Sequence, residues 1–148
     1  MKRTLCAWLL TLGLAVGTAL PASAAPFSDV ASDAWYAQGA AWAAEEGIVS
    51  GYGDGRFGPD EPVTREQLAL MLWGYARSLG LDTGAEADLS DFADRDEAAL
   101  WAREAMAWAV SAGVLSGTPE GNLNPGGTAT RAQAAVMVNQ FVAWMLKN

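Results

Sequence analysis

The feature that most constrains this 148-residue sequence is a match to itself at a constant shift of 66 residues. Such an internal repeat predicts a chain built from two copies of one structural unit. Before Trp35 the two copies are predicted to align with a shift that is smaller by four residues, which pairs Phe27-Ser28-Asp29-Val30 with Leu89-Ser90-Asp91-Phe92. The pairs matched at the shift of 66 are Trp35 and Trp101, Trp42 and Trp108, Gly47 and Gly113, Ser50 and Ser116, Gly51 and Gly117, Gly55 and Gly121, Pro59 and Pro125, Thr64 and Thr130, Arg65 and Arg131, Gln67 and Gln133, and Met71 and Met137.

Each unit is predicted to be a helix, a glycine-rich loop and a second helix. In the first unit Ser32 or Asp33 is expected to cap a helix over about 34–46, which Gly47 ends. Residues 51–55 contain three glycines and predict a tight reversal with positive φ angles. Thr64 and Gln67 then have the spacing of a capping box and begin the second helix.

The second unit follows the same plan, with a helix over about 97–112, a stop at Gly113, and a capping box of Thr130 and Gln133. No segment shows a sustained strand alternation, so the predicted class is all-α, with tandem helix-loop-helix units. The apolar stripes of the second helices are expected to form the core; they comprise Leu68, Met71, Leu72, Tyr75 and Leu79 in the first unit and Ala134, Met137, Val138, Phe141 and Met145 in the second.

The amino terminus predicts a secretory signal peptide over residues 1–24. Lys2 and Arg3 precede an apolar run, and small residues around Ala22 and Ala24 follow it. Cleavage after Ala24 would release a secreted chain that has lost Cys6 and does not insert into a membrane. A retained membrane anchor is the alternative.

Composition narrows the function classes. Without the signal peptide, 7 basic and 17 acidic residues leave a net charge of −10, which argues against nucleic acid or a bare anionic membrane as partner. There is no histidine, and the cleaved chain has no cysteine, so the usual general base, zinc ligands and thiol nucleophile are missing. We therefore expect no enzyme, no metal and no cofactor, and we interpret Gly53-Asp54-Gly55 as a turn in preference to a calcium loop.

Several ordered motifs resemble the S-layer homology repeat. In the first unit they are Phe27-Ser28-Asp29-Val30, Trp35-Tyr36, residues 47–52, Asp54-Gly55-x-Phe57-x-Pro59 and Val63-Thr64-Arg65-Glu66. The second unit keeps Thr130-Arg131-Ala132 but has Thr118-Pro119-Glu120-Gly121 in place of the Gly-Tyr-x-Asp-Gly loop. With the signal peptide at 1–24, the resemblance implies repeats at 25–79 and 89–148, separated by an acidic linker at 80–88.

What the resemblance implies is a binding module of the cell wall or S-layer surface. The family builds a pseudo-three-fold helical assembly from three repeats, and the grooves between repeats hold a secondary cell-wall polysaccharide, commonly one bearing a pyruvate ketal. The arginine of the Thr-Arg motif meets the anionic sugar there. The expected ligand-binding residues in this chain are Thr64, Arg65, Asp54, Gly55, Trp73, Thr130 and Arg131.

Two of these residue types also have a plain structural interpretation. An arginine at a capped helix start can grip a carboxylate, because free N–H groups and the helix dipole favour an anion there, but it can equally pair with a protein carboxylate. Arg65 is expected to contribute more than Arg131, because the first unit keeps the full loop and Trp73. Trp35, Trp42, Trp101 and Trp108 are predicted to pack in the core, whereas Trp73 lies off the apolar stripe and is predicted to be an exposed ring that contacts a sugar or a partner.

Two alternatives stay open. One is an envelope module that binds another wall component or a protein, and the other is a structural subunit that binds itself. Because the family assembles three repeats and this chain has two, association with itself or with another protein bearing such repeats is a further expectation. The two apolar stripes are the surfaces that would be left partly bare, unless they pack on each other.

Overall fold

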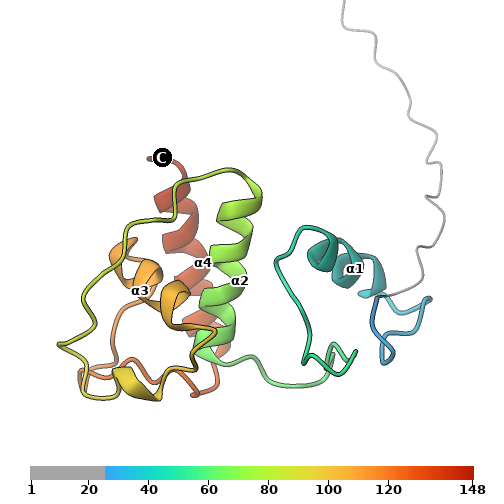
Figure 1. The fold of residues 1–148 in the computed structure, drawn as a ribbon, viewed down its shortest axis with the longest axis horizontal. Coiled ribbons are helices and arrows are strands. Elements are labelled where there is room, and N and C mark those ends of the chain that lie inside the picture. Colours follow the sequence, from blue (N-terminus) through green and yellow to red (C-terminus); the bar gives the residue numbers. More distant parts are fainter. Residues whose placement is uncertain (1–25) are drawn as a thin grey trace, which may run out of the picture.

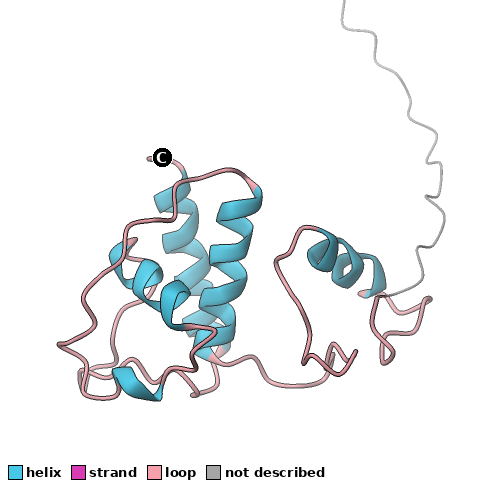
Figure 2. Ribbon diagram, viewed as in Figure 1, coloured by secondary structure: helices cyan, strands magenta, loops and turns pink. Residues whose placement is uncertain are grey.

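The computed structural model describes residues 26–148, so the predicted signal peptide lies outside the described residues. It contains four α-helices: α1 (Ala37–Glu45), α2 (Arg65–Ser78), α3 (Arg103–Ser111) and α4 (Arg131–Met145). A short 3-10 turn, η1 (Arg95–Glu97), precedes α3. Figures 1 and 2 show helices and loops with no strand over these residues, which confirms the all-α class. None of these helices has the length and apolar character that crossing a membrane requires.

The two second helices start where the sequence predicted. The side chain of Thr64 accepts a hydrogen bond from the backbone N–H of Gln67, and the side chain of Gln67 accepts one from the N–H of Thr64. Thr130 and Gln133 repeat the arrangement. Each capping box satisfies two backbone donors and fixes the start of a long helix.

The two first helices start later than predicted, at Ala37 and Arg103. Neither has a side-chain cap, and the residues ahead of α1 form turns held by bonds from Ala34 N–H to Ala31 C=O and from Ala37 N–H to Ala34 C=O. Trp35 and Trp101 therefore stand before the helices, and their spacing of seven from Trp42 and Trp108 does not place each pair on one face.

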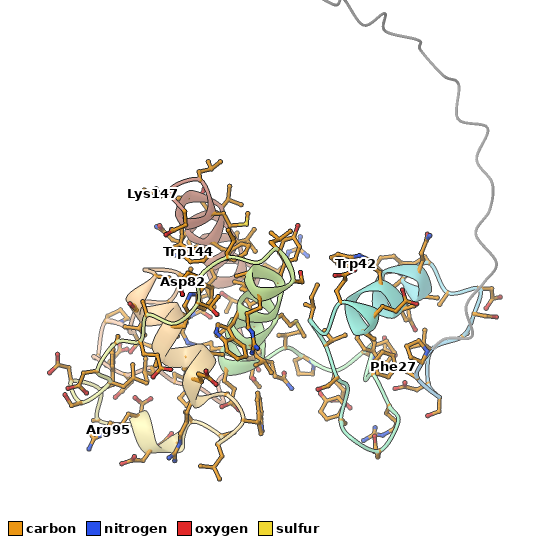
Figure 3. All side chains as sticks on the ribbon, turned by 45° about the horizontal axis from the view of Figure 1, so that its top comes forward. Phe27, Trp42, Asp82, Arg95, Trp144 and Lys147 are labelled. Carbon is orange, nitrogen blue, oxygen red and sulfur yellow. The ribbon has the colours of Figure 1, made fainter. Side chains whose placement is uncertain are left out.

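The core accordingly holds one of the four tryptophans that were predicted to lie in it. Trp108 is 1% exposed, whereas Trp42 is 48% and Trp35 93% exposed, and Trp101 is also exposed. Around Trp108 most residues of the predicted stripes of α2 and α4 pack together. Four of them lie outside this core: Met71, Leu79, Ala134 and Val138. Figure 3 labels Trp42 on the α1 side of the molecule and Trp144 on α4.

The packing centres on α2, which contacts both α3 and α4 (Figure 1). The first helix of each unit meets the second through an aromatic pair: Trp42 with Tyr75 at 6.1 Å between ring centroids, and Trp108 with Phe141 at 6.4 Å. Both pairs are edge-on, so the two units share one internal geometry. The central interface of the chain is the one between α2 of the first unit and α3 of the second.

The offset predicted for the start of each unit is wrong. Asp29 accepts hydrogen bonds from the N–H groups of Phe57 and Gly58, and Asp94 accepts the equivalent bonds from Leu123 and Asn124. Asp29 therefore corresponds to Asp94, a shift of 65 residues, and not to Asp91. The phenylalanine two residues before each aspartate agrees, because Phe27 lies against Gly51 and Phe92 against Gly117.

Candidate functional site

The glycine-rich loop of each unit is held by one carboxylate. In the first unit the Asp29 oxygens lie 2.7 Å from the nitrogen of Phe57 and 2.8 Å from that of Gly58. These donors lower the pKa of Asp29, the Phe57 N–H contributing most. In the second unit desolvation raises the pKa of Asp94, but the N–H groups of the loop outweigh it and the pKa is lowered. Each loop is thus fastened by an ionised aspartate near the start of its unit.

This fastening predicts a loss of stability in acid. A carboxyl whose pKa is depressed in the folded state stabilises the fold above its unfolded value, which is ordinarily 3.8 for aspartate, and loses that contribution as the pH falls through the folded-state pKa. We expect the free energy of unfolding to fall as the pH drops below about 5, and to go on falling below the unfolded value of 3.8. In a variant carrying Asp29→Asn and Asp94→Asn this decline should be shallower, and stability at neutral pH should be lower. Urea denaturation at several pH values measures both, and an unchanged acid slope in the double variant would contradict the assignment.

The N–H groups at the start of α2 were predicted to be free to bind an anion. In the structure they donate to backbone carbonyls of the second unit. The N–H of Arg65 donates to the carbonyl of Gly127 at 2.9 Å, and that of Glu66 to Pro125 at 3.0 Å. The Arg65 side chain is 5% exposed, with Nε donating to the carbonyl of Leu123 at 2.8 Å and Nη2 to that of Ser116 at 2.9 Å. Burial lowers the pKa of this guanidinium, with Asp94 opposing the shift.

Arg65 therefore joins the two units through backbone carbonyls, and not through a carboxylate as the structural interpretation had supposed. Glu66 adds to the same contact, because its carboxylate accepts a hydrogen bond from the N–H of Ala99 at 3.0 Å. A direct role for Arg65 in ligand binding stays a prediction. Arg131, its counterpart on α4, is exposed, and within residues 26–148 its side chain has no hydrogen-bonded or ion-paired partner.

Four other predicted site residues make local contacts. Asp54 pairs with the Arg56 side chain at 2.8 Å, which lowers the pKa of that carboxyl, and the carbonyl of Gly55 accepts a bond from Ser28 N–H at 2.8 Å. Gly51, Gly53 and Gly55 all have positive φ, which confirms the predicted reversal. Thr64 and Thr130 serve as caps, as described above. The structure does not gather these residues around Trp73.

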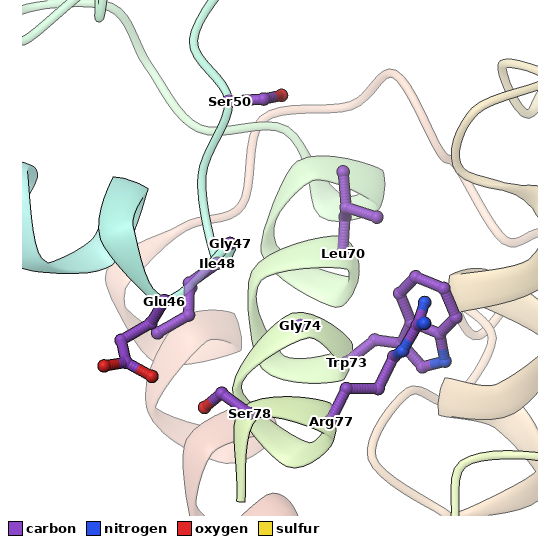
Figure 4. Close-up of a pocket in the computed structure, with 9 residues that line it drawn as sticks. All are labelled: Glu46, Gly47, Ile48, Ser50, Leu70, Trp73, Gly74, Arg77 and Ser78. Atoms are coloured by element: carbon purple, nitrogen blue, oxygen red, sulfur yellow. The ribbon is translucent and has the colours of Figure 1, made fainter. Parts of the chain in front are cut away.

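Trp73 lies at one edge of a groove along α2, and the loop that follows α1 lies at the opposite edge (Figure 4). The groove has a volume of about 510 Å³, within the range of small-ligand sites, and Figure 4 shows its lining: Glu46, Gly47, Ile48, Ser50, Leu70, Trp73, Gly74, Arg77 and Ser78. Gly74 permits this shape, because a Cβ there would press on the backbone of Ile48 at 3.2 Å. Trp73 is partly buried against the core, and its N–H is buried without an acceptor in the described part of the chain. Only the carbon part of the ring therefore borders the groove.

Arg77 is the groove residue that sequence reasoning missed. Its guanidinium lies 4.4 Å from the centroid of the Trp73 ring, one helical turn away (Figure 4). It is exposed, and no carboxylate lies within ion-pair distance of it among residues 26–148, although the whole chain carries a net charge of −8. The spacing of four from Trp73 was the available signal. An aromatic carbon surface beside an unpaired cation suits a ligand with C–H groups and a negative charge, such as an acidic sugar.

The groove is particular to the first unit, because the second unit has Asn139 and Ala143 in place of Trp73 and Arg77. A separate hollow of about 430 Å³ in the second unit is lined by acidic and polar side chains, among them Asp94, Glu97 and Glu120. Residues 26–148 contain no cluster of metal-ligating side chains.

The comparison with known families matches this chain over both units. The model of the S-layer homology domain covers residues 26–69 and 91–135. The two matched segments begin 65 residues apart, the same offset that Asp29 and Asp94 define. No solved structure matches the chain at a significant level.

Curated relatives are surface proteins and enzymes much longer than this chain. The surface-layer 125 kDa protein of Lysinibacillus sphaericus is 34% identical over 78% of this chain and 10% of its own length. The cellulosome-anchoring protein of Acetivibrio thermocellus is 26% identical over 80% of this chain and 26% of its own length. The amylopullulanase of Thermoanaerobacterium thermosulfurigenes is 32% identical over 76% of this chain and 6% of its own. The chain thus spans between 6% and 26% of the length of these relatives, and it shares with the enzyme only that small segment.

Proposed function

Because this chain belongs to the S-layer homology domain family and is a cell-surface module, we propose that it anchors by gripping an acidic polysaccharide of the cell wall without covalent attachment. The printed name of the cellulosome-anchoring relative supports an anchoring role. The observation that carries the proposal is the pair of Trp73 and Arg77 in the groove of the first unit. The module has no catalytic part in this proposal.

Two side chains of the groove would bind different parts of the ligand. The carbon face of Trp73 would pack against the C–H groups of a sugar ring, and Arg77 would pair with a carboxylate such as that of a pyruvate ketal. Ser50 and Ser78 border the same space and offer hydroxyl groups. Arg77 reaches an anion locally, which the net negative charge of the chain requires.

The residues predicted from the Thr-Arg motif would support this site at a distance. Arg65 would hold the second unit against the start of α2, and the capping threonines would fix the helix that carries Trp73 and Arg77. In a single copy of the chain, Arg131, which is exposed, would be the second cation available to the polymer.

Co-sedimentation of the purified chain with isolated cell-wall sacculi tests the proposal. We expect retention to disappear when the wall polymer is stripped, and Arg77→Gln to weaken binding about tenfold or more, since a hydrogen bond to a charged group contributes roughly 1.5–3 kcal/mol. Lys147→Gln is the matched control, because it removes one exposed positive charge from a residue that does not line the groove. Trp73→Phe should also weaken binding.

Retention that survives stripping of the polymer would favour the alternative of a protein or another wall component as partner. Equal binding by Arg77→Gln, Lys147→Gln and the unaltered chain would remove the groove from the site. Binding is compared at equal folded fractions, since Trp73 also contacts the core.

A further inference from the structure

The interface between the two units has two different halves. The first half is the start and one face of the second helix of a unit, here Arg65 and α2. The second half is the first helix and loop of the next unit, which present the carbonyls of Ser116 and Leu123 to Arg65. Backbone bonds extend the contact: Ala129 N–H donates to Val63 and Arg65 N–H to Gly127, both at 2.9 Å.

Each of the two units carries both halves. The contact within the chain uses α2 of the first unit and the first helix and loop of the second unit, so α4 and the first helix and loop of the first unit make no such contact. Arg131 at the start of α4 is exposed and unpartnered in the described chain. In the first unit the counterparts of Ser116 and Leu123 are Ser50 and Phe57, and within residues 26–148 their carbonyls accept no hydrogen bond. Donor and acceptors are therefore both open.

The apolar parts of the two unused halves are bare as well. On α2 the residues packed toward α3 include Ala69 and Ala76, each 0% exposed. On α4 the counterparts of Leu72 and Ala76 are Val138 and Val142, which are 45% and 42% exposed and lie one helical turn apart. On α1 the exposed Trp42 is the counterpart of the buried Trp108. Val138 belongs to the predicted stripe of α4, but it lies outside the core in which Met137, Phe141 and Met145 of that stripe pack.

The charges of the two bare halves are complementary. Residues 26–64, which form the first helix and loop of the first unit, carry seven acidic side chains and one basic. Residues 125–148, which include α4, carry Arg131 and Lys147 and no acidic side chain. Opposite charge favours contact between these two surfaces over contact of either surface with its own copy.

We propose that a second copy of this chain completes the interface, with α4 of one copy packed on α1 of the next. Arg131 then donates to the carbonyls of Ser50 and Phe57, and Val138 and Val142 cover Trp42. The two surfaces differ, so the contact is head-to-tail and generates a ring or an open chain of copies. The proposal does not depend on polysaccharide binding.

Sedimentation velocity of the purified chain across the micromolar range, without wall material, tests the association. We expect the mass to rise with concentration, and Val138→Asp together with Val142→Asp to return the chain to a monomer. Arg131→Ala should weaken association about tenfold. Gln140→Asp is the control, because it adds a negative charge on the opposite side of α4, and it should associate normally. A monomeric mass at every concentration would overturn the proposal and leave the sacculus experiment unaffected.

A cysteine pair tests the geometry. Thr64 and Thr128 form an antiparallel bridge inside the chain, and the corresponding pair between copies is Thr130 with Pro62. In a Cys6→Ser background, we expect a chain carrying Thr130→Cys to crosslink to a chain carrying Pro62→Cys. The pair Thr64→Cys and Thr128→Cys should close within one chain and serves as the positive control. If the internal pair closes and the pair between copies does not, the proposed interface is wrong.

Discussion

Replacing Trp108 with alanine is expected to lower the free energy of unfolding by about 3–5 kcal/mol, the range for emptying a buried aromatic site. Trp108 is 1% exposed and contacts Phe141 and Trp144, with the Trp144 ring edge-on at 5.2 Å between centroids. Its removal opens a cavity where α3 meets α4, and the rigid helices around it close that space only in part. Urea denaturation followed by far-ultraviolet circular dichroism measures the loss.

Trp42→Ala is the matched control, because Trp42 occupies the same position in the first unit. It keeps one edge-on contact, with Tyr75, but is half exposed, so we expect a loss of only about 1 kcal/mol. Both variants are compared at low concentration, where copies are apart. If Trp108→Ala proves too unstable to purify, Trp108→Phe gives a smaller loss in the same order. Equal losses at the two positions would mean that the units do not differ in burial as described.

The parts of the fold that could be predicted from the sequence are those decided over a few residues. Thr64 and Gln67 make a capping box because their side chains reach each other's backbone across three positions. The glycines at 51, 53 and 55 adopt positive φ because the loop reverses there and a side chain would strain it. Such contacts leave a clear spacing in the sequence.

The errors arose where contacts span the chain. Ser28-Asp29 and Ser90-Asp91 look alike, but the position of the fastening aspartate depends on loop N–H groups 28 and 29 residues away. The tryptophans at 35 and 101 failed to enter the core because their segments form turns, and a helical spacing has no meaning outside a helix.

The candidate site shows the same division. Trp73 was singled out because it lies off the apolar stripe of its helix, an angle that follows from helix geometry alone. Its ring is partly buried against the core, however, and not exposed as predicted. Arg77 was missed although its spacing carried a signal. The surroundings of Arg65 could not be predicted, because its acceptors are backbone carbonyls 51 and 58 residues away, and carbonyls are present at every position of any sequence.

These acceptors make Arg65→Ala the second substitution with a large expected effect, a loss of about 3 kcal/mol in the free energy of unfolding. The guanidinium donates to the carbonyls of Ser116 and Leu123 at the junction of the two units, and Leu123 is fully buried. Alanine would leave the carbonyl of the buried Leu123 without this partner, and a buried acceptor left unpaired costs roughly 1–3 kcal/mol. The carbonyl of Ser116, an exposed residue, would lose its bond as well, but water can replace it there. The second unit should then detach more readily from α2, which hydrogen exchange of the α2 and α3 amides would detect.

Arg131→Ala provides the comparison, because the same residue type at the matched helix start is exposed and its removal should change the stability of the dilute chain by less than about 0.5 kcal/mol. Arg65→Lys should fall between the two, since lysine keeps the charge but cannot reach two carbonyls with a planar fork. Urea denaturation of the three variants at one low concentration gives the ranking. If Arg65→Ala proved as stable as Arg131→Ala, the two bonds to carbonyls would contribute nothing to holding the units together. The equivalent bonds of Arg131, proposed for the contact between copies, would then lose their support.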